Sequence, residues 1–230
     1  MKSFVRIGMV LCLLMPIPAQ AAENLSKQIR DLVQQVDAQY ARTKDFQAEF
    51  VQETRIEGFD TPLRSSGRVY IKKPGKLRWD FLEPSVEEIY VQGDQLEMYV
   101  PEHQQVLKGS LTRMVATKAP LMLLQGAGKL EEHFDVEPTG DGERGTGGLP
   151  LLTLIPKRGT QPTDSPISRI VSEIQPKTFF IQTVRLHETS GNVSTYRFTH
   201  FKANTGLEDK LFTLVPPKGV VVIDDVLPSQ

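Results

Sequence analysis

Two hydrophobic periods follow one another along this chain, a helical period and then a strand period. From Asn24 to about Arg42, apolar residues recur every three or four positions, which predicts an amphipathic helix with Asn24 as its N-cap. From Phe46 to Phe50 the period changes to two. The helix is therefore expected to lead directly into the first strand.

The stretch from Gly67 to Pro84 predicts a β-hairpin. Two alternating segments flank Pro74-Gly75, a pair typical of tight turns because Pro fixes φ and Gly tolerates positive φ. Strand alternation then assigns every side chain of the hairpin to one of two faces. The apolar face carries Val69, Ile71, Leu77, Trp79 and Phe81, and the polar face carries Arg68, Tyr70, Lys72, Arg78 and Asp80.

Lys73 breaks this pattern. It lies two positions after Ile71, so its side chain starts from the apolar face, where an ammonium group is costly unless a partner binds it. One interpretation ends the strand at Lys72 and leaves Lys73 solvated in the turn. The other lets Lys73 reach from the sheet to whatever covers it.

The rest of the chain is mostly strand-like, with one helical interruption. Ile89 and Val91 are expected to pair with Leu96 and Met98 across the turn at Gly93-Asp94. Further strands are predicted at residues 105–108, 134–136, 151–155, 170–174, 179–186, 193–201 and 212–214. Between Ser110 and Gln125 the alternation stops and two short helices are expected, separated at Ala119-Pro120. The count is about eleven strands with hairpin-length connections.

A large antiparallel sheet that is polar on one face must curl and cover its apolar face. The N-terminal helix and the helices after Ser110 are the candidates for this cover. A plain packed core and a ligand cavity both fit the alternation. Met98, Met114 and Met122 favour a cavity, because flexible thioethers suit a surface that repacks.

The N-terminus resembles a cleavable secretory signal. Lys2 and Arg6 precede a short apolar run that closes on Ala19-Gln20-Ala21, so residues 1–21 are expected to be removed and residues 22–230 to form a single periplasmic domain. The only cysteine, Cys12, lies inside this signal. Without residues 1–21 the chain has 25 basic against 28 acidic residues, which argues against nucleic-acid binding.

The sequence offers little for catalysis. The four histidines, residues 103, 133, 187 and 200, have no metal-ligand spacing, and Gly140–Gly148 lacks the ending of a phosphate loop. Glu87 and Glu88 are neighbours in a strand and point to opposite faces. We therefore expect no catalytic residue, no metal and no cofactor, and a protein that is not an enzyme.

Several short strings together resemble a known family. The order GRVYIKKPGKLRWD from Gly67 to Asp80, preceded by DFQAEFVQ from Asp45, crossed by APLMLL at Ala119–Leu124 and ended by PPKGV at Pro216–Val220, is similar to the periplasmic outer-membrane lipoprotein carrier proteins of the LolA type. The resemblance covers most of the chain after residue 45. Each string alone is weakly specific, and their number and order carry the assignment.

The resemblance implies a mainly β fold, an open and incomplete antiparallel β-barrel of about eleven strands covered by helices. It also implies a lid latch at Lys73, where the family typically has Arg, and Lys lacks the planar fork of Arg. With strand parity, it predicts a lipid cavity lined by Phe46, Phe50, Val69, Ile71, Leu77, Trp79, Phe81, Ile89, Val91, Leu96 and Met98. It predicts a lid formed by Met114, Leu121, Met122, Leu123 and Leu124.

The function implied is that of a monomeric periplasmic chaperone. Acylated lipoproteins are the expected cargo, an inner-membrane lipoprotein-releasing ABC transporter the expected donor, and an outer-membrane acceptor such as a receptor lipoprotein the expected recipient. The alternative is a lipid- or lipoprotein-binding sensor or scaffold on the same fold that does not shuttle cargo.

Overall fold

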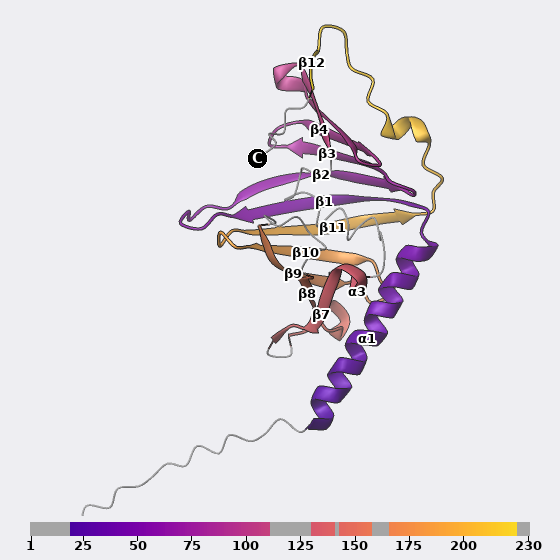
Figure 1. The fold of residues 1–230 in the computed structure, drawn as a ribbon, viewed down its shortest axis with the longest axis vertical. Coiled ribbons are helices and arrows are strands. Elements are labelled where there is room, and N and C mark those ends of the chain that lie inside the picture. The colour runs from indigo at the N-terminus through magenta and orange to yellow at the C-terminus, as the bar shows by residue number, and fades with distance from the viewer. Residues whose placement is uncertain (1–18, 111–129, 141–142, 158–165, 225–230) are drawn as a thin grey trace, which may run out of the picture.

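The computed structural model describes residues 19–110, 130–140, 143–157 and 166–224, with one long helix and a single large sheet (Figure 1). The helices are α1 (Ala19–Arg42) and α3 (Leu130–His133), and the short 3-10 segments are η1 (Pro101–His103), η4 (Thr146–Gly148) and η5 (Asp209–Phe212). The strands are β1 (Asp45–Arg55), β2 (Leu63–Lys72), β3 (Lys76–Glu83), β4 (Glu87–Gln92), β5 (Gln95–Val100), β6 (Gln105–Ser110), β7 (Phe134–Pro138), β8 (Leu152–Pro156), β9 (Ile167–Ile174), β10 (Ile181–Glu188), β11 (Val193–Ala203) and β12 (Val221–Ile223).

The strands form one open sheet in the order β12-β6-β5-β4-β3-β2-β1-β11-β10-β9-β8-β7. The ends of this order, β12 and β7, are not paired with one another, so the sheet is not closed into a barrel. The predicted open, mainly antiparallel architecture is confirmed. Two details differ, since the described sheet has twelve strands and β12 runs parallel to β6.

The hairpin predicted between Gly67 and Pro84 is present as β2 and β3. Val69 pairs with Trp79 and Ile71 pairs with Leu77, which places these side chains on one face of the sheet. We call this the inner face and the opposite one the outer face. The inner face carries the hydrophobic core of the molecule.

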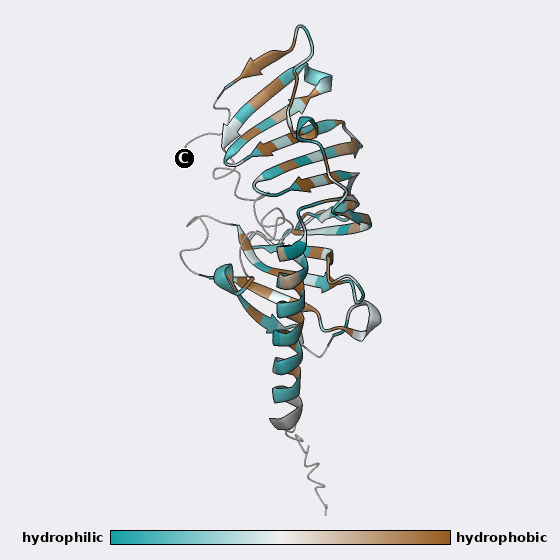
Figure 2. Ribbon diagram, turned by 90° about the vertical axis from the view of Figure 1, so that its right-hand side faces the viewer, coloured by the Kyte–Doolittle hydropathy of each residue, from teal (hydrophilic) through white to brown (hydrophobic). Residues whose placement is uncertain are grey.

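Helix α1 covers part of the inner face. Its buried stripe packs into the same core as the strands, and its polar side faces outward (Figure 2). The stripe consists of Ile29, Leu32, Val33, Val36 and Tyr40. The helix begins at Ala19, so the prediction that Asn24 caps it is wrong. No helix within the described residues is long and apolar enough to cross a membrane.

A β-bulge in β11 shifts the faces of its last residues. Gln47 pairs with Lys202 and Glu49 pairs with Thr199, so β11 has one residue more than β1 between these two pairs. His200, at a φ of 54°, absorbs this extra residue. As a result Phe201 packs against the core, although it lies three positions after the inner-face residue Phe198.

The C-terminal segment departs from its predicted strand. Residues 212–214 were expected to alternate as a strand, but Phe212 ends η5 and is fully buried. The Gln92 side-chain amide donates to the Phe212 carbonyl at 2.9 Å. The segment continues to β12 at the edge of the sheet (Figure 1). We call residues 204–223 the C-terminal strap.

Candidate lipid-binding face

The inner face is built from rows of apolar side chains that cross the strands. One row joins Val69, Trp79, Ile89 and Met98, each paired with the next, from β2 to β5. A second row joins Ile71, Leu77, Val91 and Leu96 in the same way. Because strand residues alternate between faces, this pairing follows from the period-two pattern in each strand.

The structure places all the residues predicted to line a lipid cavity on this face. Those that are buried are Phe46, Phe50, Val69, Ile71, Leu77, Trp79, Ile89, Val91 and Leu96. Phe81 and Met98 are half-buried and pack against the same core. The set is therefore contiguous, and its role in binding lipid stays a prediction. The predicted lid residues, Met114 and Leu121–Leu124, lie outside the described residues.

The inner face extends further than the sequence-based cavity list. It continues through β11, β10 and β9, where Phe198, Val184 and Ile170 are buried in the same core. Alternation was readable in Tyr196-Arg197-Phe198, but without the β1–β11 pairing no signal joined these strands to the first half of the sheet. The bulge at His200 further obscured the pattern.

An aromatic cluster surrounds Trp79, the only tryptophan of the chain. The ring centroids of Phe50 and Trp79 are 4.8 Å apart, and those of Trp79 and Tyr196 are 5.8 Å apart with the rings edge to face. Phe81 and Phe198 complete the cluster. Burial raises the pKa of Tyr196 to about 12. Strands β1, β3 and β11 thus meet in one aromatic patch on the inner face.

Lys73 contacts the cover of the sheet. Its ammonium group donates a hydrogen bond to the backbone carbonyl of Tyr40, in the last turn of α1. Burial lowers the pKa of Lys73. The partner seen is the N-terminal helix. The predicted lid, Met114 and Leu121–Leu124, lies outside the described residues, so the lid-latch role stays a prediction.

Tyr40 joins this contact to the core. Its hydroxyl accepts a hydrogen bond from the Ile181 amide at 3.3 Å, and its ring packs edge to face on Phe46 and Phe180. Burial raises the pKa of Tyr40 above its ordinary value of 10. The last turn of α1 is therefore held from both halves of the sheet.

The outer face is polar and partly covered by the C-terminal strap. Asp80 is buried there beside Arg78, with 2.8 Å between Arg78 Nε and Asp80 Oδ1, and burial raises the pKa of Asp80. A hollow on the same face is lined by Gln47, Ala48, Glu49, Arg68, Tyr70, His200 and Lys202. Its charged lining suits a polar ligand and not an acyl chain.

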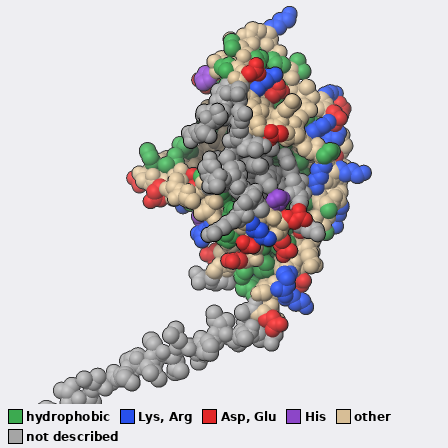
Figure 3. All heavy atoms as spheres, in the orientation of Figure 1, with side chains coloured by type: hydrophobic (Ala, Val, Ile, Leu, Met, Phe, Trp, Pro, Cys, Tyr) green, Lys and Arg blue, Asp and Glu red, His purple; other side chains and the backbone are tan. Residues whose placement is uncertain are grey.

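The end of the sheet at the β1–β2 connection exposes apolar side chains. Phe59 is 72% exposed and Leu63 is 60% exposed, and green side chains are visible at the left-hand tip in Figure 3. Leu82 and Val86, beside the β3–β4 turn, are also exposed. Both connections lie at the same end because neighbouring antiparallel strands alternate in direction. This end is therefore more apolar than an ordinary loop region.

Potential metal ligands are scattered in the part of the chain that the structure describes. Among those residues, no three His, Cys, Asp or Glu side chains come together as a metal site would require. The fold places the protein in the class that is built on an open sheet with one apolar face covered by a helix.

The comparisons with known proteins identify the family. The model of the outer membrane lipoprotein carrier protein LolA matches residues 41–215, so the chain belongs to that family. The matched region includes β1 through η5, and with them the whole inner face described above.

Relatives and solved structures agree with this assignment. An outer-membrane lipoprotein carrier protein of Dechloromonas aromatica is 27% identical over 183 residues, covering 80% of this chain and 83% of that protein. Another, of Methylobacillus flagellatus, is 24% identical over 217 residues, covering 94% and 96%. A crystal structure of an uncharacterized conserved protein from Thermus thermophilus superposes with a TM-score of 0.51 at 16% identity, covering 89% and 99%, which shows the fold alone.

Proposed function

We propose that this protein is a periplasmic carrier that binds the acyl chains of lipoproteins on its inner face and takes them from the inner to the outer membrane. The observation that carries the proposal is the continuous apolar inner face, which lies within the region matched by the carrier family. Residues 1–21 act as the export signal, and the carrier performs no reaction of its own.

The physical need for such a carrier follows from the cargo. Each CH₂ group moved out of water contributes about 0.8 kcal/mol, so several long acyl chains cannot cross an aqueous compartment unshielded. The inner-face residues now pack against α1 and one another, and cargo replaces these contacts. Binding and closure then compete for the same apolar surface, which lets the carrier release its cargo.

The cargo-binding test compares two neighbouring positions on opposite faces of β5. Met98 lies on the inner face and Tyr99 on the outer face, and both are half-buried. Met98→Glu should greatly weaken binding of a diacylated lipopeptide, because a carboxylate on the inner face opposes acyl-chain burial. Tyr99→Glu should bind as the parent does. Equal binding by the two variants would place the lipid site elsewhere.

The carrier test follows delivery. The purified protein is incubated with inner-membrane vesicles that contain a radiolabelled lipoprotein and the ABC transporter, and then with outer membranes. We expect a soluble one-to-one complex of carrier and cargo, followed by transfer to the outer membrane. Binding without release or transfer would favour a sensor or scaffold. The monomeric state is checked by light scattering of the empty protein.

A further inference from the structure

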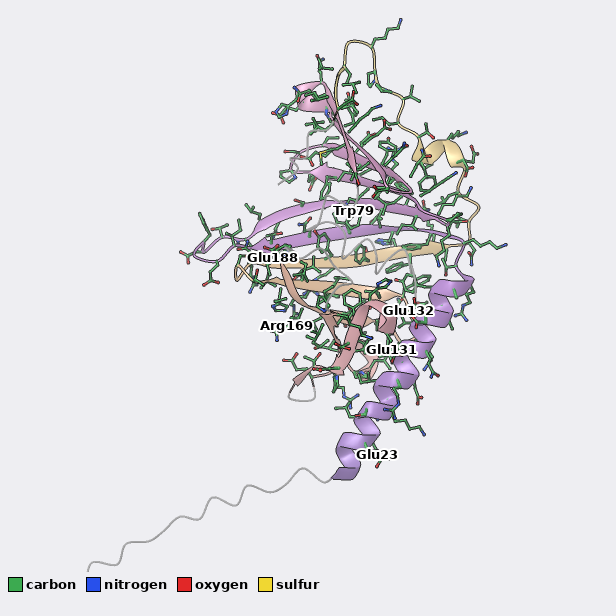
Figure 4. The ribbon with its side chains drawn as sticks, viewed as in Figure 1. Glu23, Trp79, Glu131, Glu132, Arg169 and Glu188 are labelled. Atoms are coloured by element: carbon green, nitrogen blue, oxygen red, sulfur yellow. The ribbon has the colours of Figure 1, made fainter. Side chains whose placement is uncertain are left out.

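The indole N–H of Trp79 is a hydrogen-bond donor without a partner among the residues that the structure describes. Trp79 is only 4% exposed, and its Nε1 atom is buried with no acceptor in that part of the chain. Buried donors are nearly always paired, and an unpaired one is unfavourable by the cost of its lost hydration. Figure 4 labels Trp79 over the middle of the sheet, well inside the family-matched region.

Aromatic side chains pack closely around this donor across strand β2. Trp79 stands on β3 and Phe50 on β1, yet their rings are 4.8 Å apart across β2. On β2, Gly67 pairs with Phe50 on one side and with Phe81 on the other. A Cβ at Gly67 would lie 1.9 Å from the Asp80 carbonyl oxygen and 2.9 Å from the Phe50 ring. The rings of Phe50, Phe81 and Phe198 pack around Trp79, and a phenyl ring has no hydrogen-bond acceptor other than its weakly accepting face.

Polarity increases along the inner face beyond this cluster. Two positions after Phe50 on β1 stands Gln52, whose side-chain amide donates to Thr54 at 3.1 Å. The hydroxyls of Thr54 and Ser194 are 3.0 Å apart. On the other side of the cluster, toward the α1 contact, the inner face is apolar at Ile71, Leu77, Val91 and Leu96.

We infer that the Trp79 indole N–H binds an acyl ester carbonyl of the lipid cargo and so sets the direction in which the cargo enters. This rests on the proposed function. A diacylglyceryl lipid has the same order of polarity as the inner face, with apolar tails, then ester carbonyls, then a polar end. The tails lie over Ile71 and Leu77, the carbonyl meets Trp79, and the polar end points toward Gln52 and Thr54.

An ester carbonyl suits this position better than other groups. It accepts hydrogen bonds but carries no charge and no N–H or O–H, so it brings no unpaired donor into the aromatic patch. A free carboxylate would have to be neutralised or paired there. The acyl ester is shared by lipoproteins and phospholipids, so the test includes both.

The experiment compares ester and ether lipids that differ only in their carbonyls. A peptide with an S-(2,3-bis(palmitoyloxy)propyl)cysteine and its dihexadecyl ether counterpart are titrated calorimetrically into the full protein. Dipalmitoyl phosphatidylglycerol and its diether form a second pair. The parent should prefer the ester about three- to tenfold, the range that one neutral hydrogen bond gives. Trp79→Phe should bind ester and ether equally, and lost packing affects both lipids alike.

Ser172→Ala is the matched variant. Ser172, on β9 and five strands away from β3, also has a buried side-chain oxygen with no partner among the described residues. The ester preference should persist in this variant. If Ser172→Ala removes the preference and Trp79→Phe keeps it, the assignment to Trp79 is overturned.

A spectroscopic readout needs no variant. Because Trp79 is the only tryptophan, its indole N–H gives one proton–nitrogen signal, which should move downfield with the ester and not with the ether. Equal affinity of the parent for ester and ether, with the same indole shift, overturns the inference but leaves the carrier function standing. Failure to bind either lipid overturns both.

Discussion

Lys73 Nζ donates a hydrogen bond to the backbone carbonyl oxygen of Tyr40 and so joins the β2–β3 turn to the last turn of α1. Carbonyls in the last turn of a helix have no partner within the helix, and they carry the negative end of the helix dipole. The Tyr40 carbonyl accepts one hydrogen bond from the Thr43 amide at 3.2 Å, and the Lys73 ammonium group is its second and charged donor. Helix α1, which packs on the inner face, is fixed at its C-terminus by this contact.

Removing the Lys73 contact should loosen α1. Lys73→Met keeps most of the apolar length of the side chain but leaves the Tyr40 carbonyl without its charged donor, which should lower the free energy of unfolding by about 1 to 2 kcal/mol. Amide hydrogen exchange should accelerate in the last turns of α1. If this helix also competes with cargo, Lys73→Met should load lipopeptide normally and hand it over slowly.

Lys72→Met is the matched control. Lys72 is the neighbouring residue but faces outward, where its ammonium group donates to the Leu207 carbonyl at 2.7 Å and pairs with Asp209. Its loss should accelerate exchange in the C-terminal strap and leave α1 unchanged. Identical exchange profiles for the two variants would mean that Lys73 does not anchor the helix.

Asp45 should be needed for stability. Its carboxylate is buried and accepts hydrogen bonds from the Thr205 amide at 2.8 Å and the Gly206 amide at 3.1 Å, which fixes the start of the strap. Asp45→Ala leaves both amides unpaired and should lower the free energy of unfolding by about 2 to 4 kcal/mol. Asp45→Asn keeps one acceptor oxygen and should lose less. Urea denaturation of the three proteins tests this order, and equal midpoints would contradict it.

Strand parity predicted the first half of the inner face correctly. A one-residue slip would have moved Trp79 to the outer face, so the period of two left little freedom once the hairpin turn was recognised. The partners that lie far away in sequence could not be predicted. The contact between Lys73 and Tyr40 spans 33 residues, and that between Gln92 and Phe212 spans 120.

The errors have physical causes as well. Phe212 and Leu214 alternate as strand residues do, but Phe212 is buried by packing on the outer face, where tertiary contact overrides local pattern. β12 runs parallel to β6 because the strap, which leaves β11 at Ala203, rejoins the sheet with Val221 beside Gln105, the first residue of β6. Only the fold defines this route. The unpaired Trp79 donor was not predicted, because the sequence alone does not show whether an acceptor lies beside the indole N–H.

The strap should respond to acid through Asp209. The Lys72 and Lys76 ammonium groups lie 2.6 and 2.9 Å from its carboxylate and lower the pKa of Asp209 from an ordinary 3.8 to about 2. A carboxylate whose pKa is lower in the folded state stabilises that state at every pH above its pKa in the unfolded chain. The contribution of Asp209 is therefore complete above about pH 4 and is lost as the pH falls toward 2. A carboxyl carbon NMR titration should give a midpoint near 2. Because Asp209 is exposed, added salt should move the midpoint upward, and a midpoint near 3.8 at low salt would show that the ion pairs do not form.

Gly67 should tolerate no side chain. The Cβ of Gly67→Ala would lie 1.9 Å from the Asp80 carbonyl oxygen, which belongs to the paired strand β3, and backbone cannot yield as a flexible side chain does. The added methyl group must push β3 away and separate Phe50 from Trp79, so the free energy of unfolding should fall by at least about 3 kcal/mol. Gly140→Ala is the control, because no described residue lies within 4 Å of its Cβ, and it should change stability by less than about 0.5 kcal/mol. Urea denaturation followed by Trp79 fluorescence measures both. A parent-like midpoint for Gly67→Ala would mean that β2 and β3 can separate at this point without loss, and the close packing across β2 that shapes the Trp79 site would then be wrong.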